Sequence, residues 1–274
     1  MSLFSEEELK RYRRHMVLAD FGGEGQKRLK LSSVLIVGAG GLGSPAALYL
    51  AAAGVGRLGI VDDDVVSLSN LQRQILHATS RVGVPKVESA RATLKEINPH
   101  VKLEPLNARL TPDNALDIIG RYDLVVDGSD NFATRYLISD ACYFAKKPLV
   151  WAAIGQFTGQ LSVFKPYERD ENGTPLPGYR DFLPEPPPQG SVPTCPEAGV
   201  IGALPGVMGA MQAMEAIKEL AQVGDSLAGW LIIYEALSTE FLKIRLTHRP
   251  DNPLTGQNPS IRSLKDADHT FGMV

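Results

Sequence analysis

Residues 33–62 read SVLIVGAGGLGSPAALYLAAAGVGRLGIVD, and this stretch decides the fold. It opens with Ser33 to Gly38, a short apolar run rich in β-branched residues, which is typical of a strand buried on both faces. Helical spacing follows from Pro45 to Ala53, and Gly54 ends it before a second buried strand, Arg57 to Asp62. A strand, turn, helix and strand within about 30 residues predict one parallel crossover unit.

The turn inside this unit has the chemistry of a phosphate site. Gly38, Gly40 and Gly43 fit the pattern G-x-G-x-x-G between a strand and a helix, where backbone amides can approach phosphate oxygens at a helix N-terminus. Asp62 closes the second strand about twenty residues later, the position from which a carboxylate binds ribose hydroxyls. The pattern predicts a nucleotide but does not distinguish NAD from ATP.

The same alternation continues to Lys147. A capping box at Ser5 and Glu8 predicts a helix to about Met16, and a short helix is expected near Gln26 to Leu31. Beyond Asp62 we expect helices at 86–97, 112–120 and 131–145, and strands at 101–106 and 124–127.

From Pro148 onward the pattern changes. Strands are predicted at 148–154, 159–164, 229–234 and 239–246, with a long apolar helix at 203–223. The last two strands are close enough for a hairpin, so the sheet is expected to turn antiparallel. Residues 166–199 hold about half of the prolines and read as a mobile crossover loop without secondary structure, and the polar tail 251–274 reads as poorly ordered. The prediction is a single α/β domain.

Composition excludes several classes of protein. The chain has 28 Lys and Arg against 31 Asp and Glu, so a net charge of −3 argues against a nucleic-acid binder. Two cysteines cannot form a disulfide framework or an all-cysteine zinc site. No secretory leader or membrane span is recognisable, and we expect a cytoplasmic protein.

The loops after the strands favour ATP. Arg73 and Lys86 follow the predicted strand that Asp62 closes, and Asp130 follows the strand at 124–127; the loops after such strands converge on one crevice of an open α/β sheet. A dehydrogenase needs few cations there, whereas two cations and a spare carboxylate suit a triphosphate with Mg²⁺.

Five motifs in this order resemble the MoeB/ThiF family of adenylyltransferases, which act on ubiquitin-like sulfur carriers. They are GAGGLG (38–43), Asp62-x-Asp64, SNLQRQ (69–74), VGVPK (82–86) and SDN (129–131). The resemblance runs from about Leu9 to Leu246 and includes CPEAGV (195–200).

The resemblance implies a Rossmann-like ATP-binding half at 33–147, after N-terminal helices at 1–32, and an antiparallel carrier-binding half at 148–250. It implies that Arg14 reaches the ATP of a second subunit in a homodimer. The partners implied are a carrier ending in Gly-Gly and a separate sulfur donor, either a cysteine desulfurase or a rhodanese. The implied ATP-site residues are Gly38, Gly40, Gly41, Gly43, Asp62, Asp64, Ser69, Asn70, Arg73, Gln74, Lys86, Asp130 and Asn131, with Asp130 as the Mg²⁺ ligand.

Zinc is predicted to be absent. Many family members bind zinc through two Cys-x-x-Cys pairs, and the matching places here read GYRD (178–181) and NPLT (252–255). The sequence YRDFLPEPPP (179–188) instead resembles zinc-free members fused to a rhodanese domain. Of the two cysteines, Cys142 is expected in the core, and Cys195 is either an unreactive loop thiol or a nucleophile that accepts an acyl group or persulfide.

Two other functions are considered. Ser129, Tyr143 and Lys147 superficially match the catalytic pattern of an NAD(P)-dependent short-chain dehydrogenase. A non-catalytic scaffold, like the inactive half of a heterodimeric activating enzyme, would lack the arginine and aspartate retained here.

Overall fold

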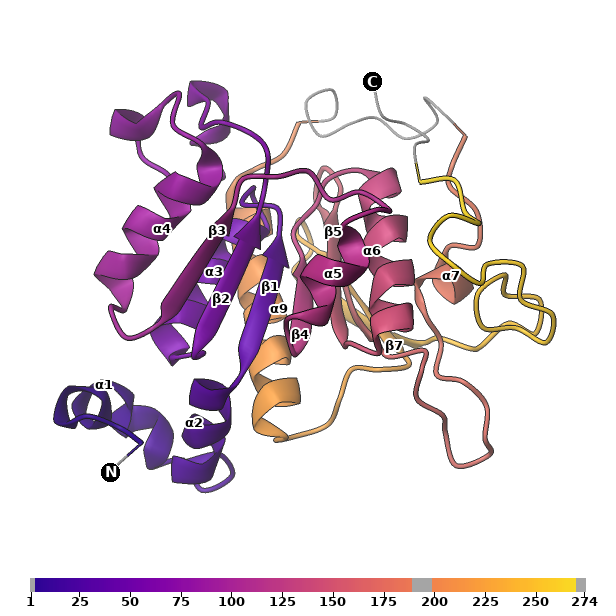
Figure 1. Cartoon of the computed structure of the whole chain (residues 1–274), viewed down its shortest axis with the longest axis horizontal. Helices are drawn as coiled ribbons and strands as arrows, with labels where there is room; N and C mark the ends of the chain where they lie inside the picture. Colours follow the sequence, from indigo (N-terminus) through magenta and orange to yellow (C-terminus); the bar gives the residue numbers. More distant parts are fainter. Residues whose placement is uncertain (1–2, 189–198, 270–274) are drawn as a thin grey trace.

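The computed structural model describes residues 3–188 and 199–269, which are built on one eight-stranded sheet (Figure 1). The strand order is β3-β2-β1-β4-β5-β6-β7-β8. The first five strands run parallel, and the pairs from β5 to β8 are antiparallel. The strands are β1 (Ser33–Val37), β2 (Arg57–Val61), β3 (Lys102–Leu106), β4 (Leu124–Asp127), β5 (Leu149–Ile154), β6 (Thr158–Phe164), β7 (Trp230–Glu235) and β8 (Glu240–Arg245). The predicted α/β class, with a mostly parallel sheet continued by antiparallel strands, is confirmed.

Helices cover both faces of the sheet. They are α1 (Glu6–Met16), α2 (Gly22–Leu31), α3 (Gly43–Ala53), α4 (Lys86–Ile97), α5 (Ala115–Gly120), α6 (Phe132–Ala145), α7 (Tyr179–Phe182) and α9 (Ala203–Ala221), with two short 3₁₀ helices, η1 (Leu68–Asn70) and η2 (Thr79–Arg81). Helices α3, α4 and α9 lie on one face, and α5 and α6 lie on the other (Figure 1).

The central strand β1 is covered on both faces of the sheet, which explains its continuous apolar sequence. All five of its residues are buried. Val34 and Ile36 belong to the hydrophobic cluster under α3 and α9, whereas Leu35 and Val37 belong to the cluster under α6. Because successive side chains of a strand point to opposite faces, a strand covered on both sides is apolar throughout.

Helix α1 lies at the end of the sheet opposite the glycine turn. Its capping box is formed: Ser5 Oγ accepts from the Glu8 amide, and a Glu8 carboxylate oxygen accepts from the Ser5 amide. Tyr12 is buried against Gly54, the left-handed residue that ends α3. The glycine turn begins α3, so the length of α3, about 16 Å, separates α1 from it.

The prediction that residues 166–199 lack secondary structure was wrong for α7. Tyr179 of α7 is buried, and its ring centroid lies 5.4 Å from that of Trp151 and 4.9 Å from that of Tyr136. The sequence GYRDF contains the aromatic and charged groups that anchor this segment, but their partners lie on β5 and α6 and cannot be read from the local pattern. Residues 189–198 are outside the described part.

The prediction of a poorly ordered tail was also wrong for residues 251–269. Leu254, Ile261 and Leu264 are buried, and His269 Nε2 lies 2.9 Å from Asp140 Oδ2. The same carboxylate accepts two hydrogen bonds of 2.8 Å from Arg180 of α7. Only a few widely spaced apolar residues of the tail pack on the domain. Its other residues are mostly polar, because they face water or, like His269, the buried ionic cluster.

The two places that carry cysteine pairs in zinc-bearing relatives lie near each other without thiolates. Asp181 accepts a 2.8 Å hydrogen bond from the Arg249 amide, and His248 lies 3.3 Å from the same carboxylate oxygen. Asn252 is buried nearby in the chain and accepts from the amides of Leu254 and Thr255. This donor set does not fit a structural zinc site, which uses thiolates and imidazoles in a tetrahedron. The absence of zinc itself remains a prediction.

Cys142 is buried in the core, as predicted, and burial raises the pKa of its thiol. Among the described residues, no helix combines the length and the hydropathy needed to cross a bilayer.

Candidate nucleotide site

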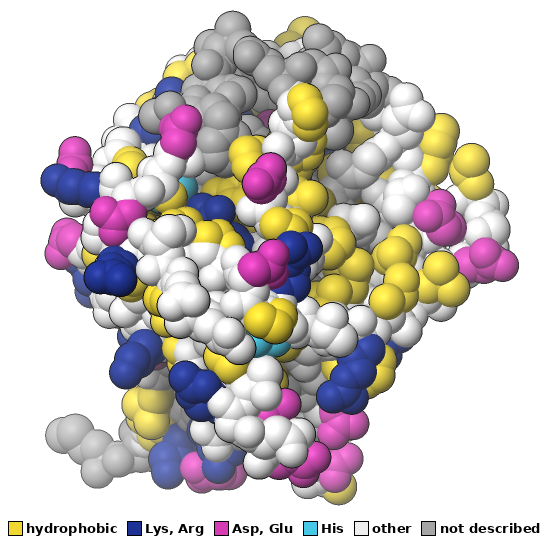
Figure 2. Space-filling view, turned by 90° about the vertical axis from the view of Figure 1, so that its right-hand side faces the viewer, with side chains coloured by type: hydrophobic (Ala, Val, Ile, Leu, Met, Phe, Trp, Pro, Cys, Tyr) yellow, Lys and Arg dark blue, Asp and Glu magenta, His cyan; other side chains and the backbone are white. Residues whose placement is uncertain are grey.

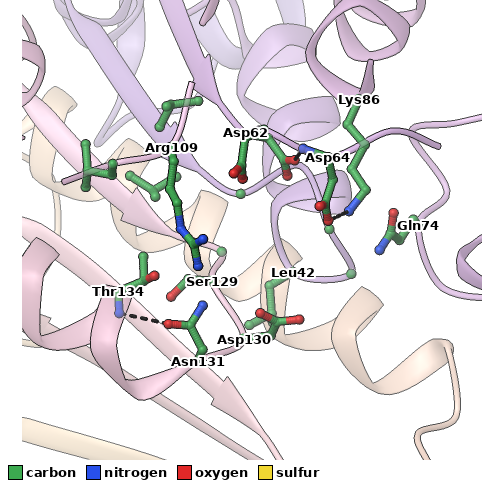
Figure 3. A pocket seen from close by; sticks show the side chains of 18 of the residues that line it. Leu42, Asp62, Asp64, Gln74, Lys86, Arg109, Ser129, Asp130, Asn131 and Thr134 are labelled. Carbon is green, nitrogen blue, oxygen red and sulfur yellow. Dashed lines mark hydrogen bonds and ion pairs between the residues drawn. The ribbon is translucent and has the colours of Figure 1, made fainter. Parts of the chain in front are cut away.

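A cavity of about 280 Å³ opens where the carboxyl ends of β1, β2 and β4 meet (Figure 3). The sheet order reverses direction between β1 and β4, and ligands of open α/β sheets bind at this switch point. The cavity is lined by Val37, Gly38, Gly40, Gly41, Leu42, Val61, Asp62, Asp63, Asp64, Arg73, Gln74, Lys86, Ala108, Arg109, Leu110, Gly128, Ser129, Asp130, Asn131, Thr134, Arg135 and Ile154.

The glycine turn forms the floor of the cavity. Gly38 has φ +92°, and a Cβ there would lie 2.8 Å from the Gly128 carbonyl oxygen, so the turn needs glycine for its conformation and for its close approach to the β4 loop. A Cβ on Gly43 would overlap the Gly38 carbonyl oxygen. At Gly40, by contrast, the nearest neighbour of a Cβ would be Gln74 Nε2 at 3.7 Å. A Cβ on Gly40 would thus meet only ordinary van der Waals contacts, and Gly40 lines the cavity, where a phosphate can approach its backbone.

Asp62 is fixed beside this turn. Its Oδ2 accepts a 2.8 Å hydrogen bond from the Ala39 amide, and its Oδ1 accepts one of 2.9 Å from the Asp64 amide. These bonds hold the carboxylate at the cavity wall, from which it can accept hydrogen bonds from ribose hydroxyls.

Two cations mark one end of the cavity. Lys86, the first residue of α4, donates from Nζ to Asp64 Oδ2 at 2.7 Å. Arg73 follows η1 and donates to the Ser69 carbonyl oxygen at 3.3 Å. Both line the cavity with Gly40 and Gly41, so this end combines positive charge with open backbone and suits phosphate groups.

The buried side chain of His77 forms a hydrogen bond with the backbone of the glycine turn. Its ring is buried, with Nε2 2.9 Å from the Ala39 carbonyl oxygen and Nδ1 2.9 Å from Ser89 Oγ. Since a carbonyl oxygen only accepts, the neutral ring carries its proton on Nε2. Burial is the main cause that lowers the pKa of His77.

The loop after β4 forms the opposite wall. Asp127 is fully buried, and its Oδ1 accepts a 2.9 Å bond from the Ser129 amide, while burial raises its pKa. Asn131 caps α6 by accepting a 2.9 Å bond from the Thr134 amide. Arg135 donates to the Ser129 carbonyl oxygen at 3.2 Å. Asp130 is exposed between these anchored residues and is free to bind a ligand.

Carboxylates suited to a hard cation lie in the same cavity. Oxygen atoms of Asp62, Asp63 and Asp64 lie within 4.8 Å of one another, and Asp130 lines the cavity from the β4 loop. Mg²⁺ prefers carboxylate oxygens together with substrate phosphates. The donor set therefore fits Mg²⁺ bound with a nucleotide.

The structure brings most of the predicted site residues together. Those that line the cavity are Gly38, Gly40, Gly41, Asp62, Asp64, Arg73, Gln74, Lys86, Asp130 and Asn131. Gly43 does not line the cavity but packs closely against the Gly38 carbonyl oxygen within the turn. Ser69 and Asn70 lie on η1, close to Arg73 in the chain, and do not line the cavity either. Arg14 is exposed on α1 and does not line the cavity of its own chain. Cys195 lies outside the described residues.

Four charged or polar residues that line the cavity are not among the predicted site residues, namely Asp63, Arg109, Thr134 and Arg135. Asp63 could have been found, because it stands between two predicted residues. Arg109 belongs to no motif, and only the position of its loop beside β4 places it in the cavity. Thr134 and Arg135 could have been inferred from the first turn of the helix that begins after Asn131.

The dehydrogenase pattern is not assembled. Ser129 lines the cavity, but Tyr143 and Lys147 do not. They lie at and beyond the C-terminal end of α6, whereas the cavity lies at its N-terminal end. The 14-residue helix separates the two ends by about 20 Å.

Comparison with solved structures supports the architecture. The crystal structure of E. coli MccB superposes with a TM-score of 0.78 at 19% identity, covering 94% of this chain and 74% of that chain. The crystal structure of PaaA gives a TM-score of 0.75 at 23% identity, covering 91% and 76%. These likenesses show a shared fold.

Sequence relatives are closer. The sulfur carrier protein adenylyltransferase of Thermus thermophilus is 50% identical over 270 residues, which cover 98% of this chain and 99% of that protein. The probable adenylyltransferase/sulfurtransferase MoeZ of Mycobacterium tuberculosis is 46% identical over 273 residues, covering 100% of this chain and 67% of MoeZ. The adenylyltransferase and sulfurtransferase MOCS3 of Bos taurus is 48% identical, and the chain spans 58% of its length.

The ThiF family model matches residues 12–255, a range that contains every strand of the sheet and every described residue of the cavity. The chain belongs to the ThiF family.

Proposed function

We propose that the protein adenylates the C-terminal glycine carboxylate of a ubiquitin-like sulfur carrier, using ATP and releasing pyrophosphate. The observation that carries this proposal is the single cavity in which an open glycine turn, a fixed Asp62, two cations and exposed carboxylates converge. The relatives named as adenylyltransferases support it over nearly the whole chain.

Each end of the cavity has a distinct part in this reaction. Gly40 and Gly41 donate backbone amides to the phosphates, Arg73 and Lys86 neutralise their charge, and Asp62 binds the ribose. Asp130, with Asn131 beside it, is the ligand proposed for Mg²⁺. When bound, Mg²⁺ supplies positive charge to the phosphate oxygens.

The chemistry needs no general base. A terminal carboxylate has a pKa of about 3.5, so it is ionised at neutral pH. One of its oxygens attacks the α-phosphorus of ATP, the bond from that phosphorus to the β-phosphate oxygen breaks, and pyrophosphate leaves as the acyl-adenylate forms. The protein contributes alignment of the two substrates and cancellation of their charge.

The carrier is proposed to dock on the antiparallel half, residues 148–250. There an apolar groove of about 230 Å³ lies between the β5–β6 turn, the start of α9 and the β7–β8 turn, lined by Gln156, Phe157, Ile201, Ala203, Leu204, Val207, Tyr234, Ala236 and Leu237. Leu237 and Ile201 are exposed in the described chain. Figure 2 shows one face of the molecule on which hydrophobic side chains group together among scattered charged ones.

The proposal extends to the assembly and its setting. Helix α1 lies at the end of the sheet away from the cavity of its own chain. This position supports a homodimer in which Arg14 reaches the cavity of the partner subunit. Sulfur is supplied by a cysteine desulfurase or a rhodanese in the cytoplasm. Cys195 stays a candidate thiol. Carriers of the molybdopterin, thiamin, cysteine and tRNA-thiolation pathways share this chemistry, and co-purification of the cognate carrier identifies which one is used.

The decisive experiment is exchange of labelled pyrophosphate into ATP. We expect exchange only when a carrier ending in Gly-Gly is present, and we expect Asp130→Asn to lower it roughly 100-fold. Asp113→Asn, which changes an exposed carboxylate that does not line the cavity, serves as the matched control. Exchange that proceeds equally without any carrier would contradict the proposed substrate.

A further inference from the structure

Arg109 differs from the other cations of the cavity in having its charge uncommitted. Lys86 is paired with Asp64, and both Arg73 and Arg135 donate to backbone carbonyl oxygens. Within the described ranges, 3–188 and 199–269, the guanidinium of Arg109 has no hydrogen bond or ion pair. Its side chain nevertheless points into the cavity, toward Ser129 and Asn131 (Figure 3).

The backbone under Arg109 is held in place. Asn114 Nδ2 donates to the Arg109 carbonyl oxygen at 2.9 Å, and Asn114 Oδ1 accepts from the Thr111 amide at 2.8 Å. The backbone of Arg109 is therefore held by hydrogen bonds while its guanidinium has no described partner. This combination indicates a side chain that is positioned to bind a ligand and is not needed to stabilise the fold.

Arg109 lies at the end of the cavity away from the phosphate cations. In Figure 3, Asp62 lies between Arg109 and Lys86. The neighbouring cavity wall contains Val37, Val61 and Leu110, which are apolar and buried. A nucleotide with its phosphates at Lys86 and its ribose at Asp62 therefore places its base between these apolar residues and the guanidinium.

We infer that Arg109 covers the face of the purine ring and acts as a determinant of base binding in this chain. The inference rests on the proposed function. A planar guanidinium stacks on an aromatic face by electrostatic attraction to the ring, and it keeps this contact while its edge remains in water. A cation at this end contributes to the affinity for the base and not to that for the phosphates.

The test compares two ligands by titration calorimetry, ATP and inorganic tripolyphosphate, with no carrier present. For Arg109→Ala and Arg109→Leu we expect the Kd for ATP to rise about five- to thirty-fold, while the Kd for tripolyphosphate stays unchanged. Arg109→Lys should fall between these variants and the wild type. Arg91→Leu, at an exposed arginine of α4 outside the cavity, is the control and should bind both ligands normally.

Three outcomes would overturn the inference. Unchanged ATP affinity in the Ala and Leu variants would exclude a contact with the base. Equal weakening of tripolyphosphate would make Arg109 a phosphate ligand. A wild-type protein that binds no ATP would overturn this inference and the proposed function together, whereas ATP binding without carrier-dependent exchange would overturn the proposed function alone.

Discussion

The Nζ atom of Lys86 lies 2.7 Å from the Oδ2 atom of Asp64, yet the lysine side chain is 6% exposed and the aspartate side chain 69%. The pair joins a buried cation to a solvated anion. Removing the lysine leaves the carboxylate in water, so stability depends little on the pair. Because Lys86 also lines the cavity, we expect its ammonium group to bind a second anion, the phosphate, as proposed.

Lys86→Met tests this position. We expect carrier-dependent pyrophosphate exchange to fall roughly 100-fold, because the charge at the phosphates is lost, while the free energy of unfolding changes by less than about 1 kcal/mol. Lys86→Arg keeps the charge but not its compact geometry and should retain partial exchange. Near-normal exchange by the Met variant would remove Lys86 from the site.

The glycine turn offers a paired comparison of fold and binding. Gly43→Ala should destabilise the protein by about 3 kcal/mol or more, since its Cβ overlaps the Gly38 carbonyl oxygen. Gly40→Ala should unfold at the wild-type temperature, because its Cβ would come no closer than 3.7 Å to a neighbour, but it should bind ATP more weakly, because the added methyl group lies at the cavity wall. Thermal unfolding and ATP titration measure the two effects, and equal melting temperatures for both variants would contradict the geometry.

His77 predicts a pH dependence of stability. Burial lowers its pKa in the folded chain, so between the folded and unfolded pKa values the unfolded chain binds more protons. Stability is therefore complete above the unfolded value of about 6.5 and falls as the pH drops toward the folded value. Groups that also act on the ring are Lys86 and Arg81, which lower its pKa, and Asp62, which raises it.

His77→Gln should flatten this dependence, because an amide can donate to the Ala39 carbonyl and accept from Ser89 without titrating. Urea unfolding between about pH 5 and 7 provides the measurement, with His15→Gln, at a partly exposed histidine, as the control. An unchanged slope in His77→Gln would show that other groups set the dependence.

The buried cluster at Asp140 should dominate stability in its region. Asp140 has no exposed surface, and its loss of charge in Asp140→Asn leaves the buried Arg180 unpaired. We expect a loss of about 3–5 kcal/mol in the free energy of unfolding. Asp117→Asn, which breaks an exposed pair with Arg121, should cost less than about 1 kcal/mol. Similar losses in both variants would contradict the role of burial.

The proposed homodimer is tested by mixing two inactive variants. In the proposed dimer, each cavity takes Lys86 from one subunit and Arg14 from the other. A mixed dimer of Arg14→Ala and Lys86→Met subunits therefore has one cavity with both residues intact and one with both changed. Random exchange of subunits should restore about a quarter of the wild-type exchange activity. No recovery, despite mixed dimers detected by native mass spectrometry, would place Arg14 in its own chain's site or outside any site.

The sequence predicted the parts of the fold that depend on local pattern. The helix at Lys86–Ile97 and the strand at Leu124–Asp127 have the expected bounds, because apolar spacing and end signals lie within each segment. Tyr179 and His269 were missed for the opposite reason. Their environments are built by Trp151 and Asp140, which lie far away in the chain and leave no local trace.

The residues of the site can also be separated into those that local motifs predict and those that only the fold brings to the cavity. The glycine turn, Asp62 and Lys86 belong to motifs that can be read from the sequence, and all three line the cavity. Arg109 lies in the cavity because the loop after β3 reaches toward β4, an arrangement that follows from the order of the sheet rather than from any motif.

The bond between Asp140 and His269 also has a consequence for the order of events during synthesis. The two residues are 129 positions apart, and Asp140 and Arg180 are 40 apart. At about 5–20 residues per second, the ribosome adds His269 roughly 6–26 s after Asp140. Arg180 follows Asp140 by 40 positions, so roughly 4–18 s of that interval remain after Arg180 is added, and during this time any contact between the two residues lacks the C-terminal segment that completes the burial of the cluster.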